Sequence, residues 1–511
     1  QEVSDSLPPT STNEFNLSDA PPPPEPLPDS DAGSEMTEDW CLDDSGCTSP
    51  GEEPTGCTTP GSGCSGSGEA KKKDGGKKDK PNPCAKSHKP LFYLNDFSYL
   101  NDPEYDGCCL GDSLKQLSCG DPCSPTKLDI GGQLRLRYHY ERGMGQQAGA
   151  TRFQNTENNF LLLRTRLYGN LQATENIRIF AEGIYADVTG ANDLYIPRGI
   201  DRNWGDFLNL FADLKMTDHK TVRLGRQELL FSAQRLVSPL DWANTRRTFE
   251  GVRVMQKYEK LSLDWFYTNF VPVVPSDLDE ADYDRSFYGM YSSYKGESET
   301  LDLYYLGFDN QTSDFSIHTI GSRLWGSSGE WLYDFEGGAQ FGRQSGLGLE
   351  HEGAYATAGI GRKLKNDPWK STMWFYYDYA SGNNRGGDFN RFNQLFPLAH
   401  KYLGFIDAVQ RANIESVNVL WTMQPSKKLK LLFWYYHLMS NQDNDVVPAI
   451  GGTPAQSLGS KDLGDTLDIL GSYSLGPRSN LVLGYSRFWR GNKILGSTDA
   501  DFGYVQYQVN F

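Results

Sequence analysis

The chain has 511 residues, 38% of them hydrophobic and 23% charged, and it carries a net charge of −17 at pH 7. This length is sufficient for several domains or for one large barrel. No apolar run approaches the roughly 18 residues of a membrane-spanning helix, so the sequence excludes a helical membrane protein. A transmembrane β-barrel is still compatible with it, because half of the strand residues in such a barrel can be polar.

The negative charge is concentrated in the first 123 residues, which contain 23 acidic and 9 basic residues. Residues 1–90 are rich in Pro, Gly, Ser and acids, and we expect them to form a disordered arm. Residues 91–126 are richer in aromatics and cysteines. We expect them to form a cap or plug on the periplasmic side of a barrel; the alternative is a short docked helix without a role in transport.

All nine cysteines lie in this N-terminal region, and the residues from Ser124 onward contain none. Cysteines among Gly, Pro and Ser suit disulfide bonds in an oxidising compartment, and their spacings lack the paired C-x2-C signature of a zinc site. Because nine is an odd number, one thiol is free or bonds another chain. The disulfide candidates are Cys41, Cys47, Cys57, Cys64, Cys84, Cys108, Cys109, Cys119 and Cys123.

From residue 127 to residue 511, segments of alternating polar and apolar residues predict an all-β fold: a closed, antiparallel transmembrane barrel of about eighteen strands. In the last segment, Val505, Tyr507 and Val509 share a face that ends in Phe511. A terminal aromatic on such a strand resembles the assembly signal of bacterial outer-membrane barrels, although a half-buried strand of a soluble sheet has the same period. The expected strands are 127–141, 159–174, 177–188, 206–216, 221–229, 247–258, 261–270, 286–295, 299–309, 315–325, 330–343, 353–365, 369–380, 412–424, 428–439, 464–475, 479–490 and 501–511.

The connections between these segments alternate in length. Long connections such as 142–158 and 381–411 alternate with short ones such as 175–176 and 259–260. Transmembrane barrels place short turns on the periplasmic side and long loops outside, whereas a soluble sandwich has no reason for this alternation. The even number of strands predicts that both termini lie in the periplasm of a bacterium, with the barrel in the outer membrane.

Charged residues recur on one face of the expected strands. A charge at the bilayer midplane costs several kcal/mol, so these faces must point into the lumen. We expect a basic early wall opposite an acidic later wall. The two walls either set a transverse field for solutes or consist of ions that pair across the lumen and fill it. The early strands contribute Arg135, Arg137, Arg164, Arg166, Arg178 and Arg253, and the later strands contribute Asp264, Asp302, Asp334, Glu336, Asp378 and Asp468, with Arg323 and Lys430 as basic exceptions.

Three stretches carry a family likeness: 131–138 (GGQLRLRY), 224–229 (LGRQEL) and 234–253 (QRLVSPLDWANTRRTFEGVR). Together they resemble the alginate-export porin family, an eighteen-strand outer-membrane fold, over roughly residues 127–511. The resemblance implies export of an anionic polysaccharide through an arginine-rich pore. Arg226 shares a face with Leu224 unless a bulge intervenes. The matching pore positions would be Arg226, Arg235, Arg246, Arg247 and Arg253, with Arg135 and Arg137 from the first strand.

Two features depart from the family pattern: the acidic later wall and the cysteine-rich arm. The predicted function is therefore a porin for passive passage of small hydrophilic solutes or anionic saccharides. The alternatives are an exporter of an alginate-like polysaccharide and a structural barrel whose arm anchors an envelope polymer. The expected partners are outer-membrane lipids and these solutes, without nucleic acid.

We expect no enzyme activity, because none of the seven histidines lies beside a serine nucleophile motif such as G-x-S-x-G. We also expect no cofactor. Loop acids at 441–445 and 499–501 are candidate Ca²⁺ ligands, but their oxygen spacing is not that of an EF-hand, and solvated loop acids are the alternative.

Overall fold

The computed structural model describes residues 57–58, 83–103, 105, 107–119, 126–190, 194–384, 386–449 and 451–511. Most of the predicted arm lies outside these residues, so its disorder stays a prediction. Four of the disulfide candidates also lie outside the described residues, and their pairing stays a prediction: Cys41, Cys47, Cys64 and Cys123.

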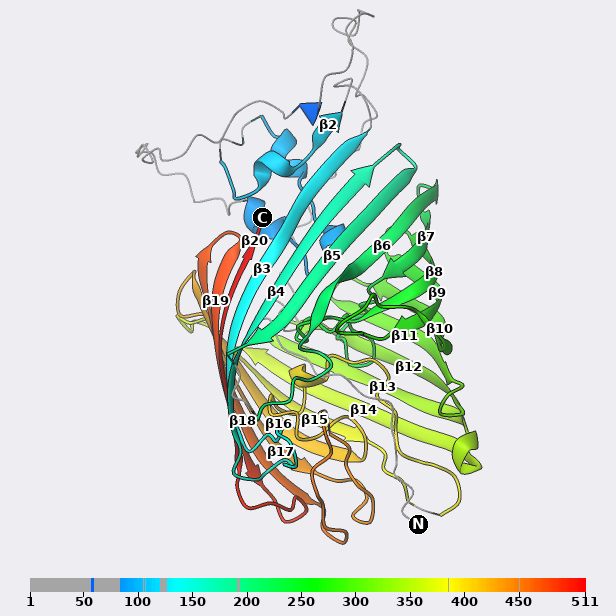
Figure 1. Cartoon of the computed structure of the whole chain (residues 1–511), viewed down its shortest axis with the longest axis vertical. Coiled ribbons are helices and arrows are strands. Elements are labelled where there is room, and N and C mark those ends of the chain that lie inside the picture. The colour runs from blue at the N-terminus through cyan, green and yellow to red at the C-terminus, as the bar shows by residue number, and fades with distance from the viewer. Residues whose placement is uncertain are drawn as a thin grey trace, which may run out of the picture.

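Eighteen strands form the wall of a closed antiparallel barrel (Figure 1). Each strand pairs with its neighbour along the chain, and β20 closes the barrel by pairing with β3. All eighteen predicted strands are confirmed, and no boundary differs from the prediction by more than four residues. The strands are β3 (Lys127–Arg142), β4 (Glu157–Gln172), β5 (Ile177–Thr189), β6 (Asn203–Thr217), β7 (Lys220–Gln227), β8 (Thr248–Lys257), β9 (Leu261–Val271), β10 (Asp282–Lys295), β11 (Glu299–Asn310), β12 (Phe315–Ser328), β13 (Trp331–Gln344), β14 (Leu349–Lys363), β15 (Thr372–Ala380), β16 (Ile414–Met423), β17 (Leu429–Met439), β18 (Asp462–Gly476), β19 (Ser479–Arg490) and β20 (Ala500–Asn510).

The period of two sorts the side chains between the two faces of the wall. In β15, Met373 and Phe375 are exposed, whereas Trp374 and Tyr376 are buried. Exposed apolar side chains recur around the barrel, which suits a surface in contact with lipid. The buried side chains point into the lumen and pack there against one another and against the long loops.

The two ends of the barrel differ. Short turns lie at the end that carries the C-terminus, and long loops lie at the other end (Figure 1). Two of the long loops, residues 228–247 and 381–413, fold into the lumen. Phe231 from the first loop and Phe396 from the second belong to the same hydrophobic core as inward side chains of the strands.

An element of short 3-10 helices, which we call the N-terminal element (residues 83–119), lies at the short-turn end (Figure 1). A disulfide joins Cys84 to Cys109, and Cys108 is also disulfide-bonded. None of the helices in the described part of the chain is long and apolar enough to cross a membrane. The element comprises η1 (Pro83–Lys86), η2 (Phe92–Leu94), η3 (Ser98–Asn101), η4 (Asp112–Leu114) and β2 (Leu117–Cys119), which pairs with β1 (Cys57–Thr58) and with the start of β3.

The N-terminal element enters the lumen with a short aromatic segment. Phe92 and Tyr93 are buried against inward aromatic side chains of β4, β5 and β6, and the guanidinium of Arg223 lies 4.3 Å from the ring centre of Tyr93. Tyr93 also donates a hydrogen bond of 2.9 Å to the carbonyl oxygen of Glu228 in the first inward loop. The division of the chain at residues 90 and 126 stays a prediction.

Candidate functional site

The lumen is narrowed by the two inward loops, which bind each other as well as the wall. The backbone N–H of Ser238 donates a hydrogen bond of 2.8 Å to the carbonyl oxygen of Phe396, and the N–H of Leu398 donates one of 2.8 Å to Gln234. Apolar residues fix these loops in the core, as the near-complete burial of Leu229 and Val237 shows. The loops therefore form part of the pore lining.

Four arginines on β3 and β4 line one side of the lumen: Arg135, Arg137, Arg164 and Arg166, which we call the basic wall. Each is almost completely buried, with an exposure of 3% or less. Arg137 donates a hydrogen bond of 3.0 Å to the carbonyl oxygen of Trp242, and its guanidinium lies 3.5 Å from the ring centre of that residue. The basic wall is thus in direct contact with the first inward loop.

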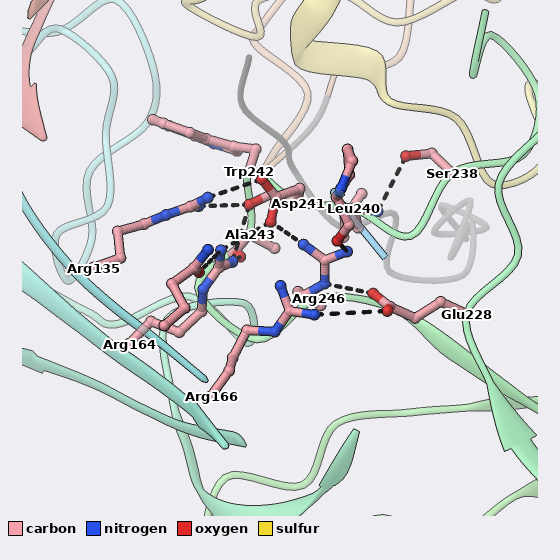
Figure 2. Close-up of polar contacts among 12 residues, drawn as sticks. Arg135, Arg164, Arg166, Glu228, Ser238, Leu240, Asp241, Trp242, Ala243 and Arg246 are labelled. Carbon is pink, nitrogen blue, oxygen red and sulfur yellow. Dashed lines mark hydrogen bonds and ion pairs between the residues drawn. The ribbon is translucent and has the colours of Figure 1, made fainter. Parts of the chain in front are cut away.

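Asp241 at the tip of that loop is shared by three arginines (Figure 2). Its carboxylate accepts hydrogen bonds of 2.8 Å from Arg135 and from Arg164, and it also pairs with Arg246. The backbone carbonyl oxygen of Asp241 accepts two further bonds, of 2.7 Å from Arg135 and 3.0 Å from Arg164. Because these bonds are charge-assisted, they hold the loop tip against the wall.

A second cluster of charges lies next to Asp241. Arg246 pairs with Glu228 as well as with Asp241, and Arg166 lies 3.9 Å from Glu228 (Figure 2). Arg166 also donates a hydrogen bond of 2.6 Å to Glu182 of β5. These carboxylates satisfy part of the hydrogen-bonding capacity of guanidiniums that burial would otherwise penalise.

The opposite side of the lumen carries the acidic wall, which we define as Asp334 and Glu336 on β13 and Asp378 on β15. Arg235 from the first inward loop pairs with Asp334 at 2.6 Å and with Glu336 at 2.5 Å. Arg323 of β12 pairs with Asp334 at 2.7 Å. Here one predicted basic exception and a loop arginine neutralise the predicted acids, which supports the view that the ions pair within the lumen.

The remaining predicted acids find different partners. Asp378 accepts a hydrogen bond of 2.7 Å from Arg411 of the second inward loop. Asp468 accepts bonds from the backbone N–H of Phe405 and from Ser486. Asp302 accepts a hydrogen bond from Ser232 of the first inward loop, and Asp264 pairs with Arg253 at 2.7 Å. Among the predicted arginines, Arg178 pairs with Asp213 of β6.

The structure places Arg226 apart from the other predicted pore arginines. It lies on the same face of β7 as the exposed Leu224, and it bonds Asp206 at 3.3 Å and Glu250 at 3.4 Å near the long-loop end. Its register partner Leu210 is also exposed. No bulge moves Arg226 to the other face, so its expected place in the lumen is wrong.

Arg247 and Arg246 lie in the first inward loop, inside the lumen. Burial lowers the pKa of Arg246 to about 10 and that of Arg247 to about 9, so both remain protonated at neutral pH. Burial acts on Arg235 in the same direction, but the carboxylates of Asp334 and Glu336 outweigh it and hold the pKa of Arg235 well above its usual range. All three loop cations are therefore permanent charges of the pore.

Several lumen residues could not be found from strand periodicity. Asp241 and Arg411 lie in long connections, which the alternation of loop lengths assigns to the outside of the barrel. Glu228 lies in the predicted strand 221–229, but β7 ends one residue before it and Glu228 belongs to the first inward loop. Arg235 was indicated only by the family resemblance. The signal that could have found the inward loops is their composition, because Phe392, Leu395 and other apolar residues are unusual in a solvated loop.

The structure describes only some of the residues in the predicted cysteine and Ca²⁺ sites. Cys57 and Cys119 are register partners of β1 and β2. Among the described residues no cluster of three His, Cys, Asp or Glu side chains could hold a metal ion. Of the acids in the two candidate Ca²⁺ stretches, Asp445 pairs with Arg391, and Asp501, which lies in β20, pairs with Arg487.

The barrel, its inward loops and its charged lumen are those of an outer-membrane channel, a class whose members are not enzymes. A family model described as alginate export matches residues 126–508, and the chain belongs to this family. This confirms the resemblance and the fold. No curated protein sequence matches the chain.

Solved outer-membrane proteins of Pseudomonas aeruginosa have a similar fold. OpdK superposes with a TM-score of 0.54 at 13% identity, covering 75% of this chain and 98% of that chain. OccK8 (OprE) gives a TM-score of 0.53 at 14% identity, with the same coverage of 75% and 98%. OccD3 (OpdP) gives 0.52 at 13% identity, covering 75% and 91%. At this level of identity the likeness concerns the fold alone.

Proposed function

We propose that this protein is a passive outer-membrane channel for small hydrophilic solutes and anionic saccharides. The observation that carries the proposal is the basic wall, because it places four guanidiniums on the lumen side of two adjacent strands, with Arg135 directly opposite Arg164 in the register. Fixed charges in a narrow pore act strongly on solutes, since little water is present to screen them. One solved structure of the similar protein OpdK contains vanillate, which is a small organic anion.

A second candidate is export of an anionic polysaccharide. It is favoured by the family match and by the arginines that the family resemblance pointed out, of which Arg246 and Arg247 lie in the lumen. The inward loops argue against it, because they pack tightly against both walls and leave a polymer less room than a small solute. A structural role in anchoring an envelope polymer stays a prediction that concerns the arm.

We infer further that the short-turn end faces the periplasm. Transmembrane barrels place short turns on that side, and the N-terminal element and the C-terminus lie at the short-turn end (Figure 1). In this orientation the N-terminal element partly caps the periplasmic mouth, because Phe92 and Tyr93 occupy the space beside β4–β6. Its disulfide lies on the oxidising side of the membrane.

Planar-bilayer recording of the purified protein tests the channel. We expect stepwise conductance and, in a KCl gradient, a reversal potential that shows preference for anions. Substituting Arg135→Gln together with Arg164→Gln should move the reversal potential toward that of a nonselective pore. The matched control is Arg343→Gln with Arg362→Gln, since both arginines are exposed on the outer face.

Two results would reject the proposal. If the protein shows no stepwise conductance, even after residues 1–119 are removed, it is not a channel. If the reversal potential is the same in the basic-wall variant and in the wild type, the basic wall does not select anions. Transport of a uronic acid polymer into proteoliposomes, at a rate comparable to that of a monosaccharide, would favour the exporter instead.

A further inference from the structure

A cavity of about 450 Å³ lies at the short-turn end, between the N-terminal element and the wall formed by β17–β20. Its size is that of a small-molecule site. The N-terminal element contributes His88, Lys89 and Phe92 to one side of it. The opposite side is formed by the turn and strand residues Lys427, Lys428, Lys430, Ser472, Ser474 and Asn480, and the inner end by Gln133, Arg166, Asp241, Gln508 and Asn510.

The charge of this cavity is strongly positive. Lys428 and Lys430 are exposed, and neither has an acidic partner within ion-pair distance among the described residues. Among the described residues that line the cavity, Asp241 is the single acid, and it is already shared by the arginines of the basic wall. Lysine ammonium groups in a concave site bind carboxylate or phosphate groups as point charges.

The cavity is also lined by neutral hydrogen-bonding side chains. Asn480 and His88 are both partly exposed, and each carries an amide or imidazole group that can donate or accept a hydrogen bond. Burial lowers the pKa of His88 to about 3, so its imidazole is neutral and can exchange a hydrogen bond with a hydroxyl group. Amides and a neutral imidazole beside lysines suit a solute that carries hydroxyl groups as well as negative charges.

One wall of the cavity lies outside the part of the chain that the family model matches, which begins at residue 126. The N-terminal element is nevertheless fixed in place. The guanidinium of Arg166 lies 3.9 Å from the ring centre of Phe92, and Arg478 of the β18–β19 turn pairs with Asp112 at 2.8 Å. The cavity is therefore specific to a chain that has this element, and at Arg166 it meets the basic wall.

We propose that this cavity is a binding site for an oligoanionic solute that carries carboxylate or phosphate groups together with hydroxyl groups. Lys428 and Lys430 bind the charged groups, and Asn480, His88 and the amides of the inner end bind the hydroxyls. The N-terminal element completes the site, and the bound solute lies next to Arg166 of the basic wall. That the site lies at the entrance of a channel rests on the proposed function, whereas binding of the solute does not depend on it.

Isothermal titration calorimetry on the full chain in detergent tests the site with three probes: a trimer of galacturonic acid, inorganic phosphate and neutral maltotriose. We expect the galacturonic acid trimer to bind and Lys428→Gln with Lys430→Gln to weaken its binding at least tenfold. Lys89→Gln on the opposite side of the cavity should weaken it severalfold. The matched control is Lys257→Gln with Lys260→Gln, because these lysines are exposed at the β8–β9 turn and do not line the cavity; it should leave the affinity unchanged.

Equal affinity in the wild type and the Lys428/Lys430 variant would overturn the proposal, and so would equal binding of maltotriose. Binding of phosphate that needs the two lysines, without binding of the galacturonic acid trimer, would support the site and assign it to phosphate-bearing solutes. A protein that conducts ions but binds neither anion refutes this inference alone. A protein that binds an anion through the lysines but never conducts refutes the channel and leaves the site.

Discussion

The basic wall and the acidic wall are held by the same inward loop, residues 228–247, but in different ways. Arg235 of this loop meets Asp334 and Glu336 as a direct ion pair. On the other side, the loop offers the basic wall backbone carbonyl oxygens as well as the carboxylate of Asp241. A carbonyl group carries only a partial negative charge, so it solvates a guanidinium without cancelling its charge.

The two walls therefore contribute differently to the electrostatic field in the pore. The acids of the acidic wall are each compensated by a full positive charge from Arg235, Arg323 or Arg411. The arginines of the basic wall are compensated in part by dipoles, which leaves more of their charge to act on a passing solute. We therefore expect the basic wall to govern ion selectivity and the acidic wall to govern stability.

The largest effect should follow from breaking the ion pairs of the acidic wall. Arg235→Met removes the partner of Glu336 at 2.5 Å and leaves two carboxylates to share Arg323, which lies 2.7 Å from Asp334 and 3.9 Å from Glu336. Removing one member of a buried pair leaves an uncompensated charge, so the free energy of unfolding should fall by about 3 kcal/mol. Urea unfolding in detergent measures the change.

The control for this substitution is Arg362→Met. Arg362 is half exposed and lies 3.7 Å from Glu330, so its loss should change the free energy of unfolding by less than about 0.5 kcal/mol. If both variants unfold at the same urea concentration as the wild type, the pairs of the acidic wall do not stabilise the barrel.

A smaller change in stability, but a clear change in selectivity, should follow from Asp241→Asn. The substitution removes the carboxylate that Arg135, Arg164 and Arg246 share, while the amide keeps one acceptor oxygen. We expect the free energy of unfolding to fall by about 2 kcal/mol, because hydrogen bonds to charged groups contribute about 1.5–3 kcal/mol each and the amide retains part of them. The reversal potential should move further toward anion preference, and a shift toward cations would contradict the comparison of the walls.

The strands of the barrel wall could be predicted almost completely from the sequence, because every strand has one face toward lipid and the other toward the lumen. That constraint imposes a period of two, as in Met373, Trp374 and Phe375 of β15. The arginines of the basic wall were found for the same reason, since their strands are long and regular. Arg226 was misplaced because the family resemblance overrode the period that placed it beside Leu224.

The contents of the lumen could not be predicted from the sequence. Loops have no period, so nothing local indicates that Asp241 meets Arg135 across a separation of 106 residues. The length of a connection says only that it is not a tight turn. The sequence left open whether the charged walls set a transverse field or pair with each other and fill the lumen. The loop residues that pair with these charges could be placed only with the structure.

A pH-dependent effect is expected at the short-turn end of the barrel, where the N-terminal element docks. Burial, together with the positive charges of Arg478 and Lys115, lowers the pKa of His88 from 6.5 to about 3. The docked N-terminal element thus binds fewer protons than the undocked one, and its docking is strongest above pH 6.5 and is lost as the pH falls from 6.5 toward 3. Below pH 6.5 the docking equilibrium should weaken by up to about tenfold per pH unit.

Limited proteolysis of residues 83–119 between pH 7 and pH 4.5, with a protease active over this range, measures that equilibrium. The control is His88→Gln, which removes the titrating group and should make cleavage less dependent on pH. An identical pH dependence in the wild type and in His88→Gln would show that His88 does not control docking.

The smallest effect should come from Arg226, which lies outside the lumen. Arg226→Gln removes charge from the outer face, where water and lipid headgroups screen it, so the reversal potential should not change and stability should fall by less than about 1 kcal/mol. The matched variant is Arg223→Gln on the opposite face of the same strand. Arg223 is buried in the lumen and bonds Asp213 at 2.7 Å, so its loss should shift the reversal potential and cost more stability. A change in selectivity from Arg226→Gln equal to that from Arg223→Gln would mean that position 226 faces the pore after all.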